Sequence, residues 1–182
     1  MFRRVRARAG RTAPGATPSL GTGSETSPGD LTGLSSILSV LDPSEVEQLG
    51  GIPGPAVVGV FIRLPSAGEP VGADQVRVNP KFVEFLHNII ARWAPDDPDL
   101  IEAARLQVDG WVYVLDGRTP TPQGRVPTED VIGAFEVRSG AVVAGSYYAS
   151  HEYKPFTERG VLKLTPFLHE RFVYELTQLP TD

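Results

Sequence analysis

The stretch NPKFVEFLHNIIARW, residues 79–93, most limits the possible folds, because it predicts a helix that other elements must cover. Asn79 can cap this helix, and Pro80 suits its first turn. Large apolar residues recur at helical spacing along it: Phe82, Phe85, Leu86, Ile89, Ile90 and Trp93. We therefore expect it to be the main core helix of a globular domain.

Short β-rich runs supply the strands expected beside this helix. AVVGVFIRL, residues 56–64, is almost continuously apolar and lies between two prolines, which predicts a central strand covered on both faces. RLQV-DG-WVYVLD, residues 105–116, and DVIGAFEV-RSG-AVVAGSYYAS, residues 130–150, are each typical of a hairpin around a turn. Together they predict an α+β fold with a largely antiparallel sheet of about five strands and helices packed on one face.

Further helices are indicated by their start signals. Asp-Pro pairs at residues 42–43 and 97–98 and a Thr-Pro pair at residues 165–166 each join a capping side chain to a proline at the first helical position. Glu45 completes a capping box with the first pair. The terminal helix has an apolar side made of Leu168, Phe172, Leu176 and Leu179.

The first 50 residues differ in character from the rest of the chain. Residues 1–30 hold a basic tip and a Pro/Gly/Ser/Thr-rich linker with almost nothing apolar to bury, which predicts a disordered tail. Residues 51–182 are expected to form a single α+β domain. Residues 31–50 are expected to be helical, and either to join the core or to dock on a partner, because apolar residues recur there at helical spacing: Leu34, Ile37, Leu38 and Leu41.

Composition excludes several classes of function. The absence of cysteine removes disulfides, thiol nucleophiles and thiolate metal sites. No run approaches the length of a membrane span, and no apolar signal segment follows the basic N-terminus, so we expect a cytoplasmic protein. Arginine outnumbers lysine 14 to 3, which is typical of a GC-rich bacterial genome. Residues 1–30 carry five arginines against two acids, whereas the remainder carries 12 basic and 20 acidic residues.

DGRTPTPQGRVPTEDV, residues 116–131, joins the two predicted hairpins and is longer than most connections. Its three prolines reduce the entropy lost when a partner orders it, which favours a binding loop that presents Arg118 and Arg125. The alternative is a connector at the sheet edge whose prolines prevent edge pairing.

No pattern has the spacing of a known catalytic or metal centre. Asp116, with Glu136-Val137-Arg138 on the next strand, resembles the acid and acid-x-Lys pattern of PD-(D/E)xK nucleases, with arginine in place of lysine. The resemblance implies a metal-dependent hydrolase or nuclease that uses Asp116 and Glu136 as ligands, and His151 is a third candidate ligand. His151-Glu152 and His169-Glu170 seldom give two ligands each, because neighbouring side chains diverge. We assign no metal, cofactor or catalytic residue and lean against an enzyme.

Two segments are candidates for partner binding. SYYASHEYKPF, residues 146–156, mixes aromatic and charged residues as interface hot spots do, and its candidates are Tyr147, Tyr148, Tyr153 and Phe156. Because side chains alternate along a strand, only one of Tyr147 and Tyr148 can face the core. The alternative role of Tyr153 and Phe156 is to hold the loop against the terminal helix. MFRRVRARAGR, residues 1–11, alternates arginine with small or apolar residues and suits phosphates, anionic headgroups or an acidic protein groove through Arg3, Arg4, Arg6, Arg8 and Arg11.

The sequence thus predicts a non-catalytic protein-interaction module, a small component of a larger bacterial multi-protein system. A protein is the expected partner. Nucleic acid is expected to bind only through the arm, because the acidic body repels a duplex. The metal-dependent hydrolase and an arm-tethered nucleic-acid accessory protein remain the two alternatives.

Overall fold

The computed structural model describes residues 37–63, 71–119 and 125–179, and the predictions for the tail and for residues 31–36 lie outside this range. In chain order, its helices and strands are β1 (Ile37–Ser39), α1 (Pro43–Gln48), β2 (Val57–Phe61), β3 (Val76–Val78), α2 (Pro80–Trp93), α3 (Pro98–Gln107), β4 (Gly110–Leu115), β5 (Val131–Arg138), β6 (Ala141–Val142), β7 (Tyr148–Ala149), β8 (Phe156–Thr157), β9 (Gly160–Val161) and α4 (Pro166–Thr177). Short 3-10 turns precede β2, β3, α3 and β5.

The α+β class with antiparallel pairing is confirmed. Within the described residues the strands are divided among three sheets: β1-β2-β3, then β4-β5 with both β6 and β7 on the far side of β5, and the β8-β9 ribbon. β2 is the central strand of its sheet, as its continuous apolar sequence predicts. None of the helices in this part of the chain has the length and apolar character needed to cross a bilayer.

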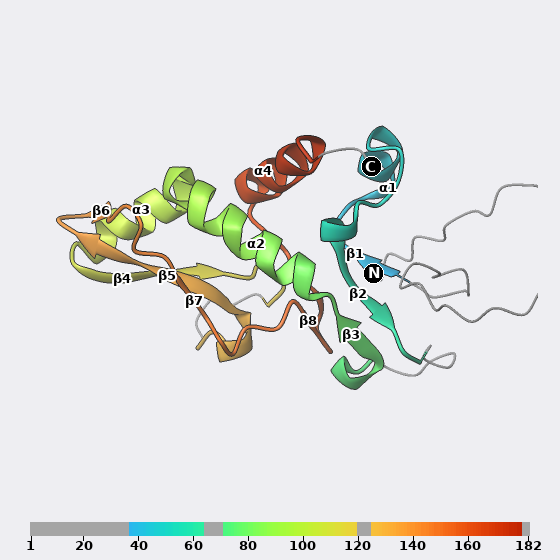
Figure 1. Cartoon of the computed structure of the whole chain (residues 1–182). Coiled ribbons are helices and arrows are strands. Elements are labelled where there is room, and N and C mark those ends of the chain that lie inside the picture. Colours follow the sequence, from blue (N-terminus) through green and yellow to red (C-terminus); the bar gives the residue numbers. More distant parts are fainter. Residues whose placement is uncertain (1–36, 64–70, 120–124, 180–182) are drawn as a thin grey trace, which may run out of the picture.

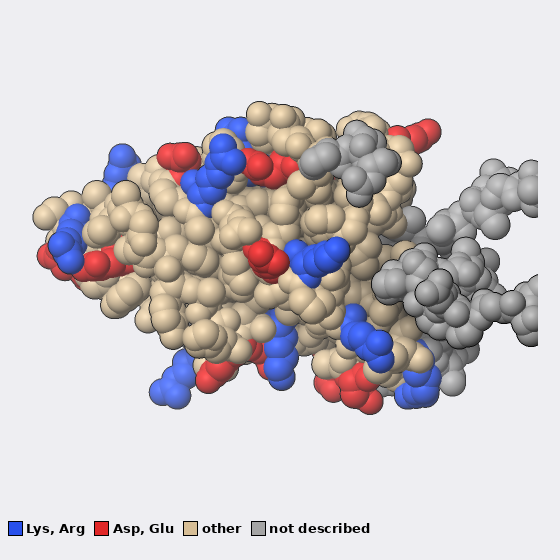
Figure 2. Space-filling model, in the orientation of Figure 1, with Lys and Arg blue, Asp and Glu red and all other residues tan. Residues whose placement is uncertain are grey.

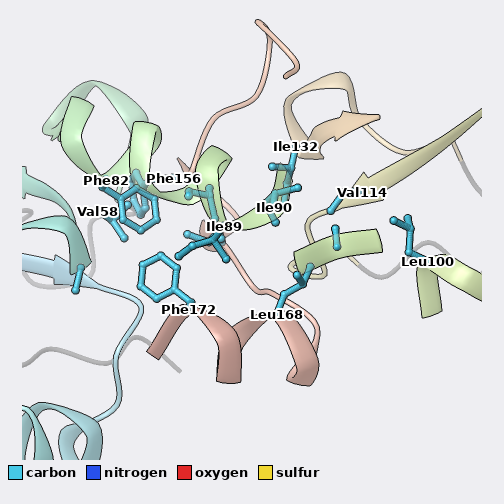
Figure 3. Packing of buried hydrophobic residues seen from close by; sticks show 14 of the residues in the cluster. Val58, Phe82, Ile89, Ile90, Leu100, Val114, Ile132, Phe156, Leu168 and Phe172 are labelled. Carbon is cyan, nitrogen blue, oxygen red and sulfur yellow. The ribbon is translucent and has the colours of Figure 1, made fainter. Parts of the chain in front are cut away.

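Helix α2 is the main core helix, as predicted, and its cap is Asn79. In Figure 1 it crosses the middle of the molecule, with β1–β3 toward one end, β4–β7 toward the other and α4 beside it. Phe82 and Phe172 of α4 lie with ring centroids 5.9 Å apart. Figure 3 shows Ile89 and Ile90 in the same apolar cluster, between the helices and the sheet. The apolar residues of α2 are therefore covered by other elements on several sides.

The predicted caps are also present. Asp42 accepts hydrogen bonds from the first turn of α1, and the Glu45 carboxylate accepts one from the Asp42 backbone N–H at 2.7 Å, which completes the capping box. Asp97 caps α3, and Thr165 caps α4. These local signals hold because each depends on residues within one turn.

The helix predicted for residues 31–50 is wrong in part. Ile37–Ser39 forms strand β1, in which Ile37 pairs with Val60 and Leu38 with Gly59 of β2, and helix begins only at Pro43. Leu38 is buried, so the apolar spacing does mark core residues. Pairing with a neighbouring strand outweighs the weak local preference for helix.

The first predicted hairpin is also wrong. Helix α3 extends to Gln107, the chain turns through Val108 and Gly110 with φ of 64° and 118°, and β4 then pairs with β5. The Asp-Gly signal therefore marks a helix-to-strand turn. The second hairpin is confirmed, since β5 and β6 are joined at Ser139 and Gly140, both with positive φ.

Candidate functional site

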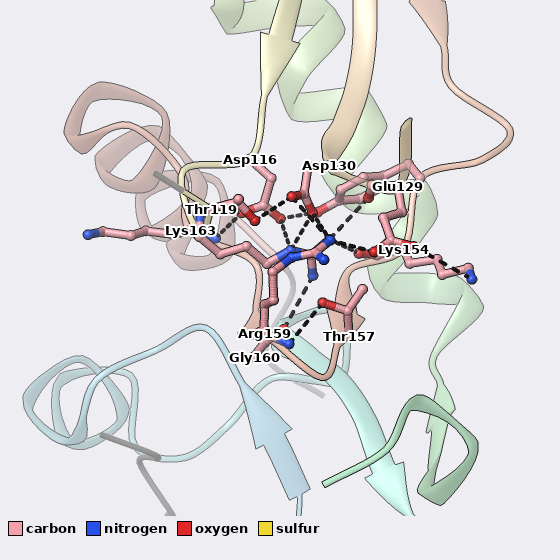
Figure 4. Close-up of polar contacts among 11 residues, drawn as sticks. Asp116, Thr119, Glu129, Asp130, Lys154, Thr157, Arg159, Gly160 and Lys163 are labelled. Atoms are coloured by element: carbon pink, nitrogen blue, oxygen red, sulfur yellow. Dashed lines mark hydrogen bonds and ion pairs between the residues drawn. The ribbon is translucent and has the colours of Figure 1, made fainter. Parts of the chain in front are cut away.

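The long connection after β4 begins with a buried arginine. The side chain of Arg118 is 2% exposed, and its Nε donates to Oδ1 of Asp130 at 2.7 Å and lies 3.5 Å from Oδ2 of Asp116. Thr119 Oγ1 donates to the other oxygen of Asp130. Figure 4 shows Asp116, Thr119 and Asp130 close together where β4 ends and β5 begins. We call this group, with Glu129, Tyr153 and Arg159, the Arg118 cluster.

The guanidinium of Arg118 also binds backbone. It donates to the carbonyl oxygens of Glu129 at 3.0 Å, Lys154 at 2.5 Å and Gly160 at 3.3 Å. Arg159 adds an ion pair to Glu129 and lies 3.4 Å from Asp130. One side chain thereby joins the end of β4, the start of β5 and the β8-β9 ribbon, so the first part of the connection is a structural brace.

The two buried carboxylates have pKa values displaced in opposite directions. Burial raises the pKa of Asp116, and hydrogen bonds from the Lys163 and Arg118 backbone and the Tyr153 hydroxyl offset this only in part. Burial also opposes ionisation of Asp130. There, however, hydrogen bonds from Thr119 and Arg118, with the nearby guanidinium charges, prevail and hold the pKa below its usual value. Asp130 is the better paired of the two.

The acids of the nuclease-like pattern do not meet. Asp116 follows Leu115, which pairs with Val131, whereas Glu136 lies opposite Trp111 at the other end of the ladder. At about 3.3 Å per residue, roughly 15–20 Å of strand separates the two acids. Among the described residues there is no group of three His, Asp or Glu side chains placed to hold a metal ion.

Three of the four candidate aromatics serve the core. Tyr147 packs on Phe135 with centroids 5.0 Å apart, and its hydroxyl lies 2.7 Å from Nδ1 of His87; burial raises the Tyr147 pKa and lowers that of His87. Tyr153 donates to Asp116 at 3.2 Å, and Phe156 is 3% exposed. These three side chains, like that of Arg118, make contacts inside the protein, and their role as partner contacts stays a prediction.

Tyr148 is different, since it belongs to an exposed surface. Tyr113 of β4 and Tyr148 of β7 both pair with Ala134 of β5, one from each side, so the two rings share one face around a small residue. Tyr113 is 56% exposed and Tyr148 57% exposed, and Trp111, two residues along β4, is 47% exposed. We call this surface the outer face, comprising Trp111, Tyr113, Ala134, Glu136 and Tyr148.

Charged and polar side chains border the aromatic residues of the outer face. Glu136 is opposite Trp111 and pairs with Arg138 at 2.7 Å, while the His151 ring meets Tyr148 edge-on at 5.8 Å. The opposite side of the same sheet is buried, with Val112, Val114 and Phe135 in the core. Within the described residues, helices therefore pack on one side of this sheet, as predicted, and the other side is exposed.

The sequence did not identify Trp111 and Tyr113 as site residues. WVYVLD alternates, and either the two aromatics or the two valines can be its core side. The bulkier set normally faces inward, whereas here β4 buries Val112 and Val114. Val112 and Val114 are on the buried side of the strand, and α3 packs against β4. The one available signal was the alternation itself.

The other predicted residues lie apart from this face or outside the described range. Arg125 is exposed, close to where the described chain resumes. His169 is placed 2.7 Å from Glu45, where it joins α4 to α1. The five arm arginines, Arg3, Arg4, Arg6, Arg8 and Arg11, lie outside the described residues.

Comparisons with protein-family models, with curated proteins and with solved structures find no match.

Proposed function

We propose that the protein is a non-catalytic protein-interaction module whose outer face binds a protein partner. The observation that carries this proposal is the register Tyr113–Ala134–Tyr148, which presents two exposed tyrosines on a rigid sheet, with Trp111 beside them. Tyrosine and tryptophan lose little rotamer entropy on binding and contribute large contact areas.

The charge distribution agrees better with a protein partner than with a duplex. Figure 2 shows one side of the molecule, on which acidic and basic side chains are interspersed and form no continuous basic surface. On the outer face, Glu136 and Arg138 pair with each other. Interspersed charges at the rim of an aromatic centre are typical of protein interfaces.

We also propose that the module works in the bacterial cytoplasm, as a small part of a multi-protein system, because its sequence lacks cysteine and is rich in arginine. If the captured material disappears with nuclease in the experiment below, the result favours a nucleic-acid accessory role through the basic arm.

The test is a comparison of affinity captures from native cells with and without nuclease. We expect a stoichiometric protein that survives nuclease, that is lost with Tyr113→Ser/Tyr148→Ser, and that is retained with Tyr174→Ser. Tyr174 is a matched control, since it is 48% exposed but lies on α4. If the unaltered protein and both variants capture the same partner, the outer face is refuted as the binding site. It is also refuted if the captured material disappears with nuclease.

A further inference from the structure

Strand β4 is an edge of its sheet. Within the described residues it pairs with β5 alone, so one side of its six-residue backbone is without a strand neighbour. An edge strand offers a row of amide and carbonyl groups that a further strand can pair with. Proteins commonly cover such edges or use them to bind extended segments.

A groove lies along the second half of this edge. Tyr113, Val114 and Leu115 line one wall, and because three consecutive strand residues take part, the groove follows the backbone edge and not one face. The other wall comes from the helices, with Leu100 and Ala103 of α3. A side chain that points inward from an added strand would meet small and apolar groups here.

Carboxylates lie at the helical side of the groove. Asp97 and Asp99 belong to its lining, and Asp96 is adjacent in sequence. The Asp97 carboxylate is already bound within the protein, because it caps α3 and accepts a hydrogen bond from Thr165 at 2.6 Å. Asp96 and Asp99 are exposed, and neither takes part in an ion pair with another described residue. The carboxylates attract a basic segment through space, and the apolar wall suits an extended segment with small side chains on its inner side.

The chain contains such a segment in RVRARA, residues 4–9. Its strict alternation, with arginine at every second position and valine or alanine between, has the period of a strand with one basic and one small apolar face. Its six residues equal the length of β4. The acidic excess of the remainder of the chain favours its approach.

We propose that residues 4–9 of the same chain bind along the free edge of β4 as an added strand. Val5, Ala7 and Ala9 then face Leu100 and Ala103. The alternate arginines lie over the outer face, where guanidinium groups stack on Trp111 and Tyr113.

The connection is long enough for this. From Gly10 to Ser36 there are 27 residues before β1 begins at Ile37. At about 3.3 Å per residue they can span up to roughly 90 Å, more than a domain of this size requires. A docked arm covers part of the outer face, so it would compete with any partner bound there. The docking itself rests on the β4 edge, the groove and the arm sequence, and not on the proposed function.

The test is amide hydrogen exchange of Gly110–Leu115 in the full chain. A tethered arm has an effective concentration of about 1 mM, so a Kd of about 0.1 mM for docking slows edge exchange roughly tenfold. We expect that slowing to disappear in Arg4→Glu/Arg6→Glu/Arg8→Glu. Exchange rates on β4 that are equal in the unaltered chain and in this variant would overturn the proposal.

A second variant separates strand docking from simple charge attraction. Val5→Arg/Arg8→Val keeps the composition and net charge but groups the arginines at residues 4–6 and the apolar residues at 7–9, so it destroys the alternation and we expect it also to lose the slowing. If it retains the slowing, the added strand is refuted. Protection that appears only at high protein concentration, together with a dimer in sedimentation, would refute docking by the same chain. Since partner capture is not used here, the outcome is independent of the outer-face test.

Discussion

The Arg118 cluster and the outer face use the same two strands in opposite ways. Both combine charged and aromatic side chains, but the cluster lies where β4 ends and β5 begins, and the outer face lies on β4, β5 and β7 themselves. In the cluster, Arg118 is 2% exposed and binds two carboxylates and three carbonyl oxygens, so its binding capacity is used inside the protein. On the outer face, Tyr113 and Tyr148 keep more than half of their surface exposed.

The difference shows that residue type alone does not separate a binding site from a brace. Arginine and tyrosine are favoured in interface hot spots because they offer hydrogen bonds together with apolar surface. The same properties let Arg118 and Tyr153 satisfy buried acids and carbonyls. The two regions differ in how much side-chain surface stays exposed in the folded protein. This difference in exposure predicts different consequences of mutation.

The largest expected effect is on the cluster. Arg118→Met leaves Asp116 and Asp130 buried without their shared cation, so we expect a loss of about 3–5 kcal/mol in the free energy of unfolding. Arg138→Met, whose partner Glu136 lies on the outer face, should cost less than about 1 kcal/mol because that pair is exposed. Urea unfolding measures both. Equal losses would abolish the distinction between the two regions.

A smaller effect is expected from one hydroxyl group. Tyr153→Phe removes a donor to the buried Asp116 and should cost about 1–2 kcal/mol. Tyr148→Phe is the matched control, since its ring lies on the exposed outer face, and it should change stability by less than about 0.5 kcal/mol. Thermal unfolding of the two variants compares them directly, and a larger loss for Tyr148→Phe would reverse the assignment.

A further contrast lies within the cluster and appears in acid. Asp130 has a lowered pKa, so its stabilising contribution is present above the unfolded value of about 4 and is lost as the pH falls through the folded pKa. Asp116 has a raised pKa, so its contribution falls as the pH rises from about 4 through the folded pKa. We expect Asp130→Asn to flatten the acid loss of stability and Asp116→Asn to steepen it, in unfolding curves measured at successive pH values. The same change of slope in both variants would contradict these directions.

The smallest expected effect is on the outer face itself. Tyr113→Ser/Tyr148→Ser should alter the free energy of unfolding by less than about 1 kcal/mol in total, because neither ring is buried. Circular dichroism during heating provides the measurement. A loss comparable with that of Arg118→Met would mean that these tyrosines support the fold, and the outer face would then lose its claim as a binding surface.

Several parts of the fold could be predicted because their signals are local. Asn79-Pro80, Asp97-Pro98 and Thr165-Pro166 begin helices where expected, and the Ser139-Gly140 turn joins two strands. Each signal acts within four or five residues. The wrong predictions, the helix at 37–39 and the first hairpin, both concern short segments whose partner strand lies far away in sequence.

By itself, the sequence determined the helix starts, the α+β class and the apolar residues that fill the core, since caps, turns and periodicity are local or additive. Only the tertiary structure decided the role of each polar or aromatic candidate. Tyr147 and Tyr148 are neighbours, yet the first packs on Phe135 and the second is exposed. The physical reason is that strand register and helix placement, set by contacts between distant segments, decide which side of each strand meets water.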